Sequence, residues 1–179
     1  MHSLQFIAIE LVPSSDPEDA DQEAVGHIES MLEGVDAYPK WSDWYSIKES
    51  RWISQYTVVN AAREPDRWKE YIDQAKKWRA EHVKDYLSKA KLDDFAKKAN
   101  LYAKKLLGIG YQPWNALDNM GLDMNIYYTT RLASIMNDEW SSDSVFYDLN
   151  DWTSMFEAVE KRATINPAHQ FLVPVDFHH

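Results

Sequence analysis

Four titratable side chains from separate parts of the sequence could act together at one site: Asp43, Arg51, Asp176 and His178. An Asp–Arg–His set can orient a phosphate group or carry out acid–base chemistry. Asp43 and Arg51 can equally form a structural ion pair, and ion-pair networks commonly resemble active sites. We favour the structural interpretation, so we assign no catalytic residue and keep the enzymatic one as the alternative.

The sequence contains no motif for a metal ion or a cofactor, and we expect neither. It has no cysteine, which excludes disulfides, thiolate zinc sites and cysteine nucleophiles. HExxH, EF-hand and phosphate-loop patterns are absent. The adjacent residues His178 and His179 would point to opposite faces of a strand, which argues against a metal site.

Aromatic residues are densest between Tyr38 and Trp52, where fifteen residues hold three of the eight tryptophans and two tyrosines. Aromatic rings at this density either lock a core or form a contact surface. We take this stretch, with the C-terminal histidine, as the candidate binding surface. Its residues are Trp41, Trp44, Tyr45, Arg51, Trp52 and His178.

The elements that would position these residues follow from hydrophobic periodicity and from the turn residues between apolar runs. We expect strands at Leu4–Val12, Asp43–Ile47, Ser144–Asp148 and Phe171–Phe177, with Arg51 to Val59 either continuing the second strand or returning beside it. We expect helices from Pro17 (capped by Asp16) to Gly34, from Pro65 onward, over Met124–Met136, and from Asn150 or Asp151 to Arg162.

Three finer expectations concern the placement of these elements. The polar residues Gln5 and Glu10 indicate that the first strand is covered mainly on one face. Pro174 indicates that the last strand lies at a sheet edge. The last helix should bury a stripe formed by Trp152, Met155, Phe156 and Val159.

Two apolar stripes follow Pro65, one from Trp68 to Ala90 and one from Leu92 to Leu107. At about 100° per residue the second stripe is out of phase with the first, so one straight helix would separate the two faces. We therefore expect a helical hairpin with a break near Ser88–Asp93. The whole chain, 1–179, then reads as a single α+β domain. Its fold would be a ferredoxin-like split βαβ sheet with a long helical-hairpin insertion at 63–136.

The net charge of −10 is spread unevenly. Residues 63–105 carry thirteen Lys/Arg and eight Asp/Glu, whereas the rest of the chain carries six and twenty-one. A solvated helical face accounts for the basic block, and a surface for nucleic acid or another anionic partner is the alternative. The lysines concerned are Lys76, Lys77, Lys84, Lys97, Lys98, Lys104 and Lys105.

The segment DWYSIKESRW, Asp43 to Trp52, resembles the D-W-Y-x-I-G-G-R-W signature of uncharacterised proteins of phages and bacterial genomes. Those proteins end in a segment like V-V-D-C-H, and this chain has Val-Pro-Val-Asp-Phe-His at 173–178. It departs from the pattern at Glu49 and Ser50, where the family has two glycines, and at Phe177, where the family has cysteine. The resemblance implies a phage or mobile-element origin and supports the fold, but the family has no assigned activity.

Taken together, these features favour a small acidic interaction protein that binds and inhibits a host macromolecule, of the anti-CRISPR or other anti-defence type. The acidic groups Asp16, Glu18, Asp19, Asp21 and Glu23, or those between Asp138 and Asp151, would cover a basic channel. The alternative is a small enzyme acting on a nucleotide or nucleic acid through Arg51, Asp176 and His178. A homodimer built on the helical hairpin is a third reading. No membrane segment or secretory signal is visible, so we expect a cytoplasmic protein.

Overall fold

The computed structural model describes residues 2–33, 42–47, 52, 54–90, 93, 97 and 123–178. Trp41, Arg51 and Gly34 lie outside these residues, as does most of the expected second helix of the hairpin at 92–107. The chain forms two units, which are described separately. One comprises Met1–Arg79 with Asp138–His179, and the other comprises Ala80–Asn137.

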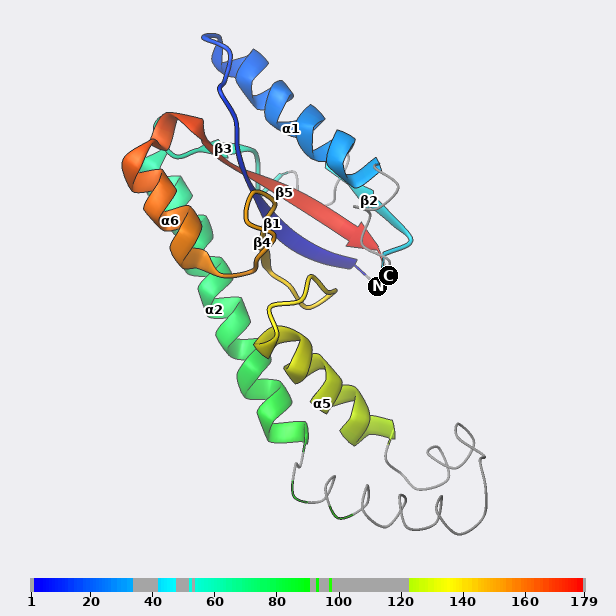
Figure 1. Ribbon diagram of the computed structural model, residues 1–179. Coiled ribbons are helices and arrows are strands. Elements are labelled where there is room, and N and C mark those ends of the chain that lie inside the picture. The colour runs from blue at the N-terminus through cyan, green and yellow to red at the C-terminus, as the bar shows by residue number, and fades with distance from the viewer. Residues whose placement is uncertain are drawn as a thin grey trace. The chain divides into compact units, whose positions relative to one another are not determined.

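The first unit contains a mixed sheet with strand order β2-β5-β1-β4 (Figure 1). A further short strand, β3, also pairs with β5. The strands are β1 (His2–Glu10), β2 (Trp44–Ser46), β3 (Val59–Asn60), β4 (Phe146–Asp148) and β5 (Gln170–His178). The helices are α1 (Pro17–Glu33), α2 (Pro65–Ala90), α5 (Asp123–Met136) and α6 (Phe156–Ile165), with a short 3-10 turn, η1, at Pro167–His169. The α+β class is therefore confirmed.

One split βαβ unit is present in this sheet. β1 and β2 are each antiparallel to β5 and are joined through α1, so they run parallel to each other with β5 between them. The second half does not repeat this pattern, because β4 is parallel to β1 whereas β5 is antiparallel to it. Of the predicted ferredoxin-like arrangement, only the first half is thus found in the described residues.

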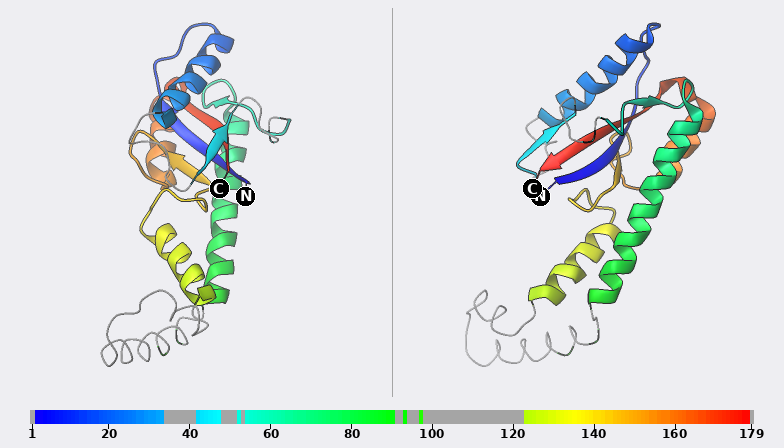
Figure 2. Two further views of the ribbon diagram at one scale, coloured as in Figure 1. Left: turned by 90° about the vertical axis from the view of Figure 1, so that its right-hand side faces the viewer. Right: turned by 180° about the vertical axis from the view of Figure 1, so that it is seen from behind.

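Helices cover the sheet on both faces, with α1 on one side and α6 and the first part of α2 on the other (Figures 1 and 2). Alternate β1 residues divide between the two layers, as the pleat requires. Phe6 and Ala8 pack with α2 and α6, whereas Ile7 and Ile9 pack with α1. The expectation that β1 is covered mainly on one face is therefore wrong. Its apolar run reflects burial on both faces, as in other doubly covered strands.

The prediction that Pro174 marks an edge strand is also wrong, because β5 lies inside the sheet with partners on both sides. Phe6, which is opposite Pro174 on β1, donates its N–H to the Val145 carbonyl on the β4 side, at 3.1 Å. This is consequently a non-hydrogen-bonded pair of the β1–β5 ladder, and the Pro174 nitrogen faces away from β1. It faces the interval between β2 and β3, where a missing N–H costs the sheet no hydrogen bond.

The start of α1 follows its sequence signals. Asp16 Oδ1 accepts the backbone N–H groups of Glu18 at 2.9 Å and Asp19 at 3.2 Å, as expected of an N-cap. Acidic side chains in the first turn add a favourable interaction with the helix dipole.

The start of the last helix was predicted wrongly. α6 begins at Phe156 and not at Asn150 or Asp151. Phe156 and Val159 are buried as expected, but Trp152 and Met155 are exposed. Trp152 has a φ of 52°, which is incompatible with a right-handed helix.

The second unit contains the end of α2, from Ala80 to Ala90, together with α5. Among the described residues of this unit, Tyr86, Leu132 and Ile135 form a small core. α2 ends at Ala90, within the region where the two stripes predicted a break, and α5 matches the predicted helix to within one residue. Within the described residues, no helix is long and apolar enough to cross a membrane.

Tyr147 of β4 generates a prediction about alkaline stability. Burial raises the pKa of its hydroxyl above 10.0, and the negative charges of Asp138 and Asp148 add to the effect. Above pH 10 the unfolded chain loses this proton while the folded chain keeps it, so the free energy of unfolding should fall with rising pH. The contribution is at most about 1.4 kcal/mol per pH unit. Tyr147→Phe should make this decline shallower in urea unfolding measured from pH 8 to 11.

Tyr127→Phe, at an exposed position, provides the matched control for the loss of a tyrosine hydroxyl. Equal slopes for the wild type and Tyr147→Phe would contradict the prediction.

Candidate functional site

One end of the sheet gathers three of the four titratable residues that the sequence singled out: Asp43, Asp176 and His178. The register pairs His2 of β1 with His178 of β5, and Trp44 of β2 also pairs with His178. Three strands that are distant in sequence therefore end side by side. We call the group formed by His2, Asp43, Trp44, Asp176 and His178 the histidine–tryptophan patch.

The central polar contact of the patch joins His2 to Asp176. His2 Nδ1 lies 3.2 Å from both carboxylate oxygens of Asp176. The Asp176 side chain is 2% exposed, whereas that of His2 is 30% exposed. A buried carboxylate needs a hydrogen-bonding partner, and His2 supplies one. This contact also fixes the imidazole ring, with Nδ1 held by the carboxylate.

Trp44 is fixed by the two histidine rings. Its ring is stacked on His178, with centroids 5.1 Å apart and planes 9° apart. His2 approaches the same indole edge-on at 5.4 Å and lies 5.1 Å from the His178 ring. Nevertheless, Trp44 remains 45% exposed. The indole is therefore held in one position while a large part of its surface faces solvent.

The link between β2 and β5 is completed by Ser42 and Asp43. The buried Ser42 hydroxyl lies 2.8 Å from the carbonyl oxygens of both Trp44 and His178, and the Asp43 N–H donates to the His178 carbonyl at 2.8 Å. The Asp43 carboxylate lies 3.3 Å from His178 Nδ1, outside hydrogen-bond geometry. It is 73% exposed, so this contact contributes little to stability.

The other residues predicted for the binding surface lie elsewhere or are not described. Tyr45 packs on the α1 face of the sheet, beside Phe177, with ring centroids 6.4 Å apart. Trp52 packs against the cluster on the α2 and α6 face. Trp41 and Arg51 lie outside the described residues. His2 was missed because one histidine at the start of a strand carries no sequence signal; only the register with His178 brings it into the site.

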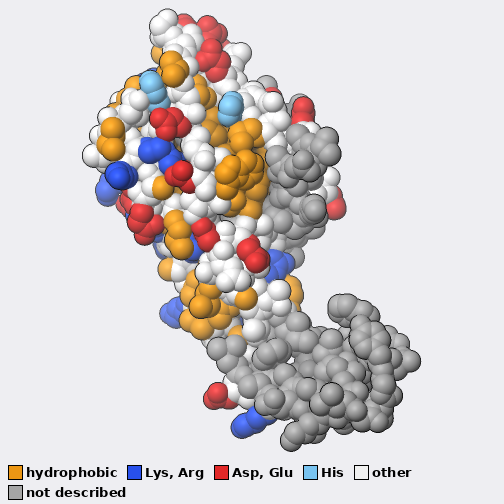
Figure 3. Space-filling view, in the orientation of Figure 1, with side chains coloured by type: hydrophobic (Ala, Val, Ile, Leu, Met, Phe, Trp, Pro, Cys, Tyr) orange, Lys and Arg blue, Asp and Glu red, His pale blue; other side chains and the backbone are white. Residues whose placement is uncertain are grey.

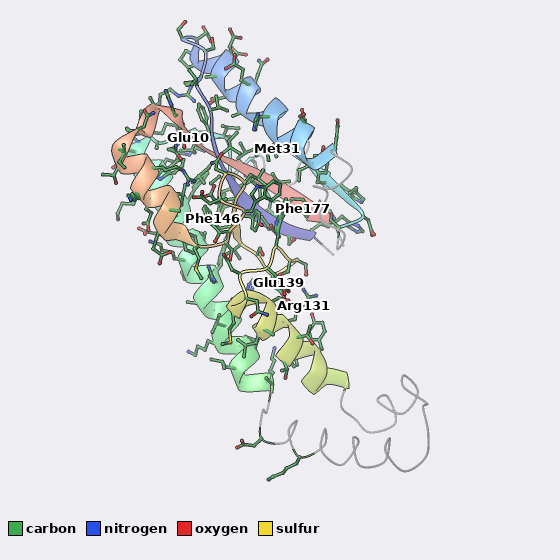
Figure 4. The ribbon with its side chains drawn as sticks, in the orientation of Figure 1. Glu10, Met31, Arg131, Glu139, Phe146 and Phe177 are labelled. Carbon is green, nitrogen blue, oxygen red and sulfur yellow. The ribbon has the colours of Figure 1, made fainter. Side chains whose placement is uncertain are left out.

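A second charged cluster lies at the opposite end of the sheet, as the labels of Glu10 and Phe177 in Figure 4 indicate. Arg162 of α6 forms ion pairs there with Asp148, Asp151 and Glu10. Its Nε also donates to Gln170 Oε1 at 3.3 Å. Asp148 is fully buried, and its other oxygen accepts the Asn150 N–H at 3.1 Å.

Asp148 stabilises the protonated form of Arg162. Burial acts to lower the pKa of the guanidinium, but the hydrogen bond and charge of Asp148, followed by those of Asp151, outweigh it and raise the pKa above its ordinary value. Because one arginine joins carboxylates from the ends of β1 and β4 to α6, this cluster is structural. It anchors the helix to the sheet.

The acidic side chains proposed to cover a basic channel are largely engaged within the protein. Asp16 caps α1, Asp21 pairs with Arg63, and Glu23 accepts the Ser14 N–H. Asp138 accepts the hydroxyls of Thr153 and Ser154. On the face shown in Figure 3, acidic and basic side chains of the sheet-bearing unit are interspersed.

Among the described residues, open depressions of about 480 Å³ each lie along α2 beside Glu70 and between α1 and Val58. Among the residues that the structure describes, no three His, Asp or Glu side chains are placed to hold a metal ion. The patch therefore combines a fixed aromatic ring with two histidine–carboxylate contacts.

Comparison with known proteins identified no matching family model, no matching curated protein and no matching solved structure. The functional argument therefore depends on the geometry of this chain.

The Arg162 cluster yields a stability prediction. Arg162→Met leaves the buried Asp148 carboxylate without its cation and should lower the free energy of unfolding by about 3–5 kcal/mol. The double variant Arg162→Met/Asp148→Asn removes both charges and should recover much of the loss. Urea unfolding of the wild type and the two variants measures both effects.

Lys69→Met is the matched control, because Lys69 pairs with Asp73 at an exposed position on α2 and its loss should cost less than about 1 kcal/mol. A similar small loss for Arg162→Met would show that the cluster does not anchor α6.

Proposed function

We propose that this chain is a small acidic interaction protein that binds a host macromolecule and inhibits it. We further propose that a phage or mobile element encodes it and that it acts as an anti-CRISPR or other anti-defence protein. The observation that carries the proposal is the fixed, exposed indole of Trp44 in the histidine–tryptophan patch. Tryptophan residues dominate the binding energy of many protein interfaces, and fixing them beforehand lowers the entropic cost of binding.

The form of the patch supports recognition of a large partner. It presents the 45% exposed indole of Trp44 at the end of a sheet, where a macromolecule can cover it. The acidic residues act mainly inside the protein, so we assign the main contribution to Trp44 and treat the net charge of −10 as a long-range influence on association.

The test begins with affinity capture of the tagged protein from a bacterial lysate at low and then moderate salt, with mass spectrometry of what is retained. A partner held at moderate salt is then purified, and its affinity is measured by calorimetry. Trp44→Ala should weaken binding by roughly 30-fold or more, which corresponds to about 2 kcal/mol. The matched control is Leu87→Ala, which removes an exposed apolar side chain of the other unit and should change the affinity less than about two-fold.

If Trp44→Ala binds the purified partner as tightly as the wild type, the patch is not the interface. If nucleic acid alone is captured and is released as salt rises, the lysines of α2 become the candidate surface.

A second candidate function is supported by the His2–Asp176 contact. A buried carboxylate that holds one imidazole nitrogen leaves the other able to exchange a proton with a substrate, as in histidine–aspartate catalytic pairs. This supports a small enzyme acting on a nucleotide or nucleic acid, with His2 taking the role that the sequence assigned to His178. Arg51, the remaining member of the proposed set, lies outside the described residues.

Thermal-shift measurements with a panel of nucleotides test this candidate. A stabilising nucleotide should raise the Tm of the wild type, and Asp176→Asn should abolish the shift because the imidazole loses its orienting carboxylate. Asp73→Asn is the control, since Asp73 is an exposed carboxylate of α2 that pairs with Lys69 and does not belong to the patch. The absence of any shift across the panel, or an undiminished shift in Asp176→Asn, would count against the enzyme.

A further inference from the structure

The cross-strand pair of His2 and His178 brings two imidazole rings together on one face of the sheet. Hydrogen bonding alternates along the β1–β5 ladder, in which Phe6–Pro174 is a non-hydrogen-bonded pair. His2 lies four residues before Phe6, so His2–His178 is a pair of the same kind, and in such pairs the opposite side chains come closest. The two ring centroids are 5.1 Å apart. The rings are therefore close enough to share one ligand atom.

This separation is the one that a shared metal ion requires. A tetrahedral Zn²⁺ binds an imidazole nitrogen at about 2.0–2.1 Å, and the centre of the ring lies about 1 Å further along the same line. Two imidazoles bound to one such ion consequently have centroids about 5 Å apart. The observed distance of 5.1 Å matches this value without any movement of the strands.

The carboxylates of the patch leave Nε2 as the available nitrogen of each ring. His2 Nδ1 lies 3.2 Å from both oxygens of the buried Asp176 carboxylate. His178 Nδ1 is buried and faces the Asp43 carboxylate at 3.3 Å, although 32% of the His178 side chain is exposed. Among the described residues, none is hydrogen-bonded to Nε2 of either ring. Metal-binding histidines usually have a carboxylate at the other ring nitrogen, because it orients the ring and raises the basicity of the ligand atom.

We infer that His2 and His178 together bind one divalent transition-metal ion through their Nε2 atoms, and that Zn²⁺ matches the site best. Asp176 is the positioning residue for His2. No third His, Asp or Glu of the described residues completes the site, so water or a group from a bound partner fills the remaining coordination positions. No sequence motif predicts this pair, because its members lie 176 positions apart. The inference holds whether or not the patch binds a macromolecule.

Calorimetric titration of the full-length protein, without a histidine tag, with ZnCl₂ at about pH 7.5 tests this inference, because the imidazoles must be neutral to bind. One ion should bind per chain. His2→Gln and His178→Gln should each weaken binding by at least about ten-fold, since each removes one of two ligands, and Asp176→Asn should weaken it by roughly ten-fold. His27→Gln is the matched control, because His27 is exposed on α1, and it should change the affinity less than about two-fold.

Both single variants are needed to show that the ion is shared. Zinc binding that survives His2→Gln would come from other histidines, such as the adjacent His178 and His179, and would overturn the inference. Binding that survives His178→Gln, or no binding by the wild type, would overturn it as well.

A second measurement uses the wild type alone and does not depend on how well a variant folds. Long-range ¹H–¹⁵N NMR spectra of the histidine rings report each ring nitrogen separately. Zn²⁺ should shift Nε2 of both His2 and His178 and leave the nitrogens of His27 unchanged, and acidification to about pH 5.5 should reverse the shifts because protons compete with the metal for Nε2. Shifts confined to one ring, or centred on Nδ1, would contradict a shared ion.

Discussion

The antiparallel pairing of β1 with β5 is the interaction on which the rest of this fold depends. It runs over nine residue pairs, from His2–His178 to Glu10–Gln170, and joins segments at opposite ends of the chain. Every other strand is positioned by one of these two: β4 pairs with β1, and β2 and β3 pair with β5. Both strands are covered on both faces of the sheet. Their side chains therefore alternate between two hydrophobic cores, one on each face.

This ladder also determines what each end of the sheet can do. At the end where β1 begins, its register places two histidines opposite each other, and the short β2 adds Trp44 beside them. At the end where β1 finishes, the carboxylates of Glu10 and Asp148 come together, and Arg162 compensates them. One end is therefore closed by a buried ion pair, whereas the other leaves an indole and two imidazoles at the surface. A shift of one residue in the register would turn every side chain to the other face and separate both groups.

The sequence was informative where a local pattern was sufficient. The apolar runs of β1 and β5, the Asp16 cap and the end of α2 were all predictable, because each depends on a few neighbouring residues. Sheet order was not, since β2 could pair with any strand until its register with β5 was known. The edge position predicted from Pro174 was wrong for the same reason. The missing N–H of Pro174 costs no hydrogen bond because β2 and β3 pair with β5 on either side of it. The site was half predictable, since Asp176 and Trp44 stood out by type, but His2 became visible only through pairing across 176 positions.

Trp44 and Trp152, both exposed, show how differently a chain can present the same side chain. Trp44 is held by rings: His178 stacks on it and His2 meets it edge-on, so its position depends on two titratable neighbours. Trp152 is held by its backbone, through a closed turn that forces a positive φ. Hydrophobic periodicity predicted that Trp152 would lie in a buried helical stripe. Residue spacing does not reveal that the residues of this turn donate hydrogen bonds to the carboxylates of Asp138 and Asp148 instead of forming a helix. The hydrogen-bonding needs of these two carboxylates outweigh helix propensity at 150–155, and the exposed indole is the consequence.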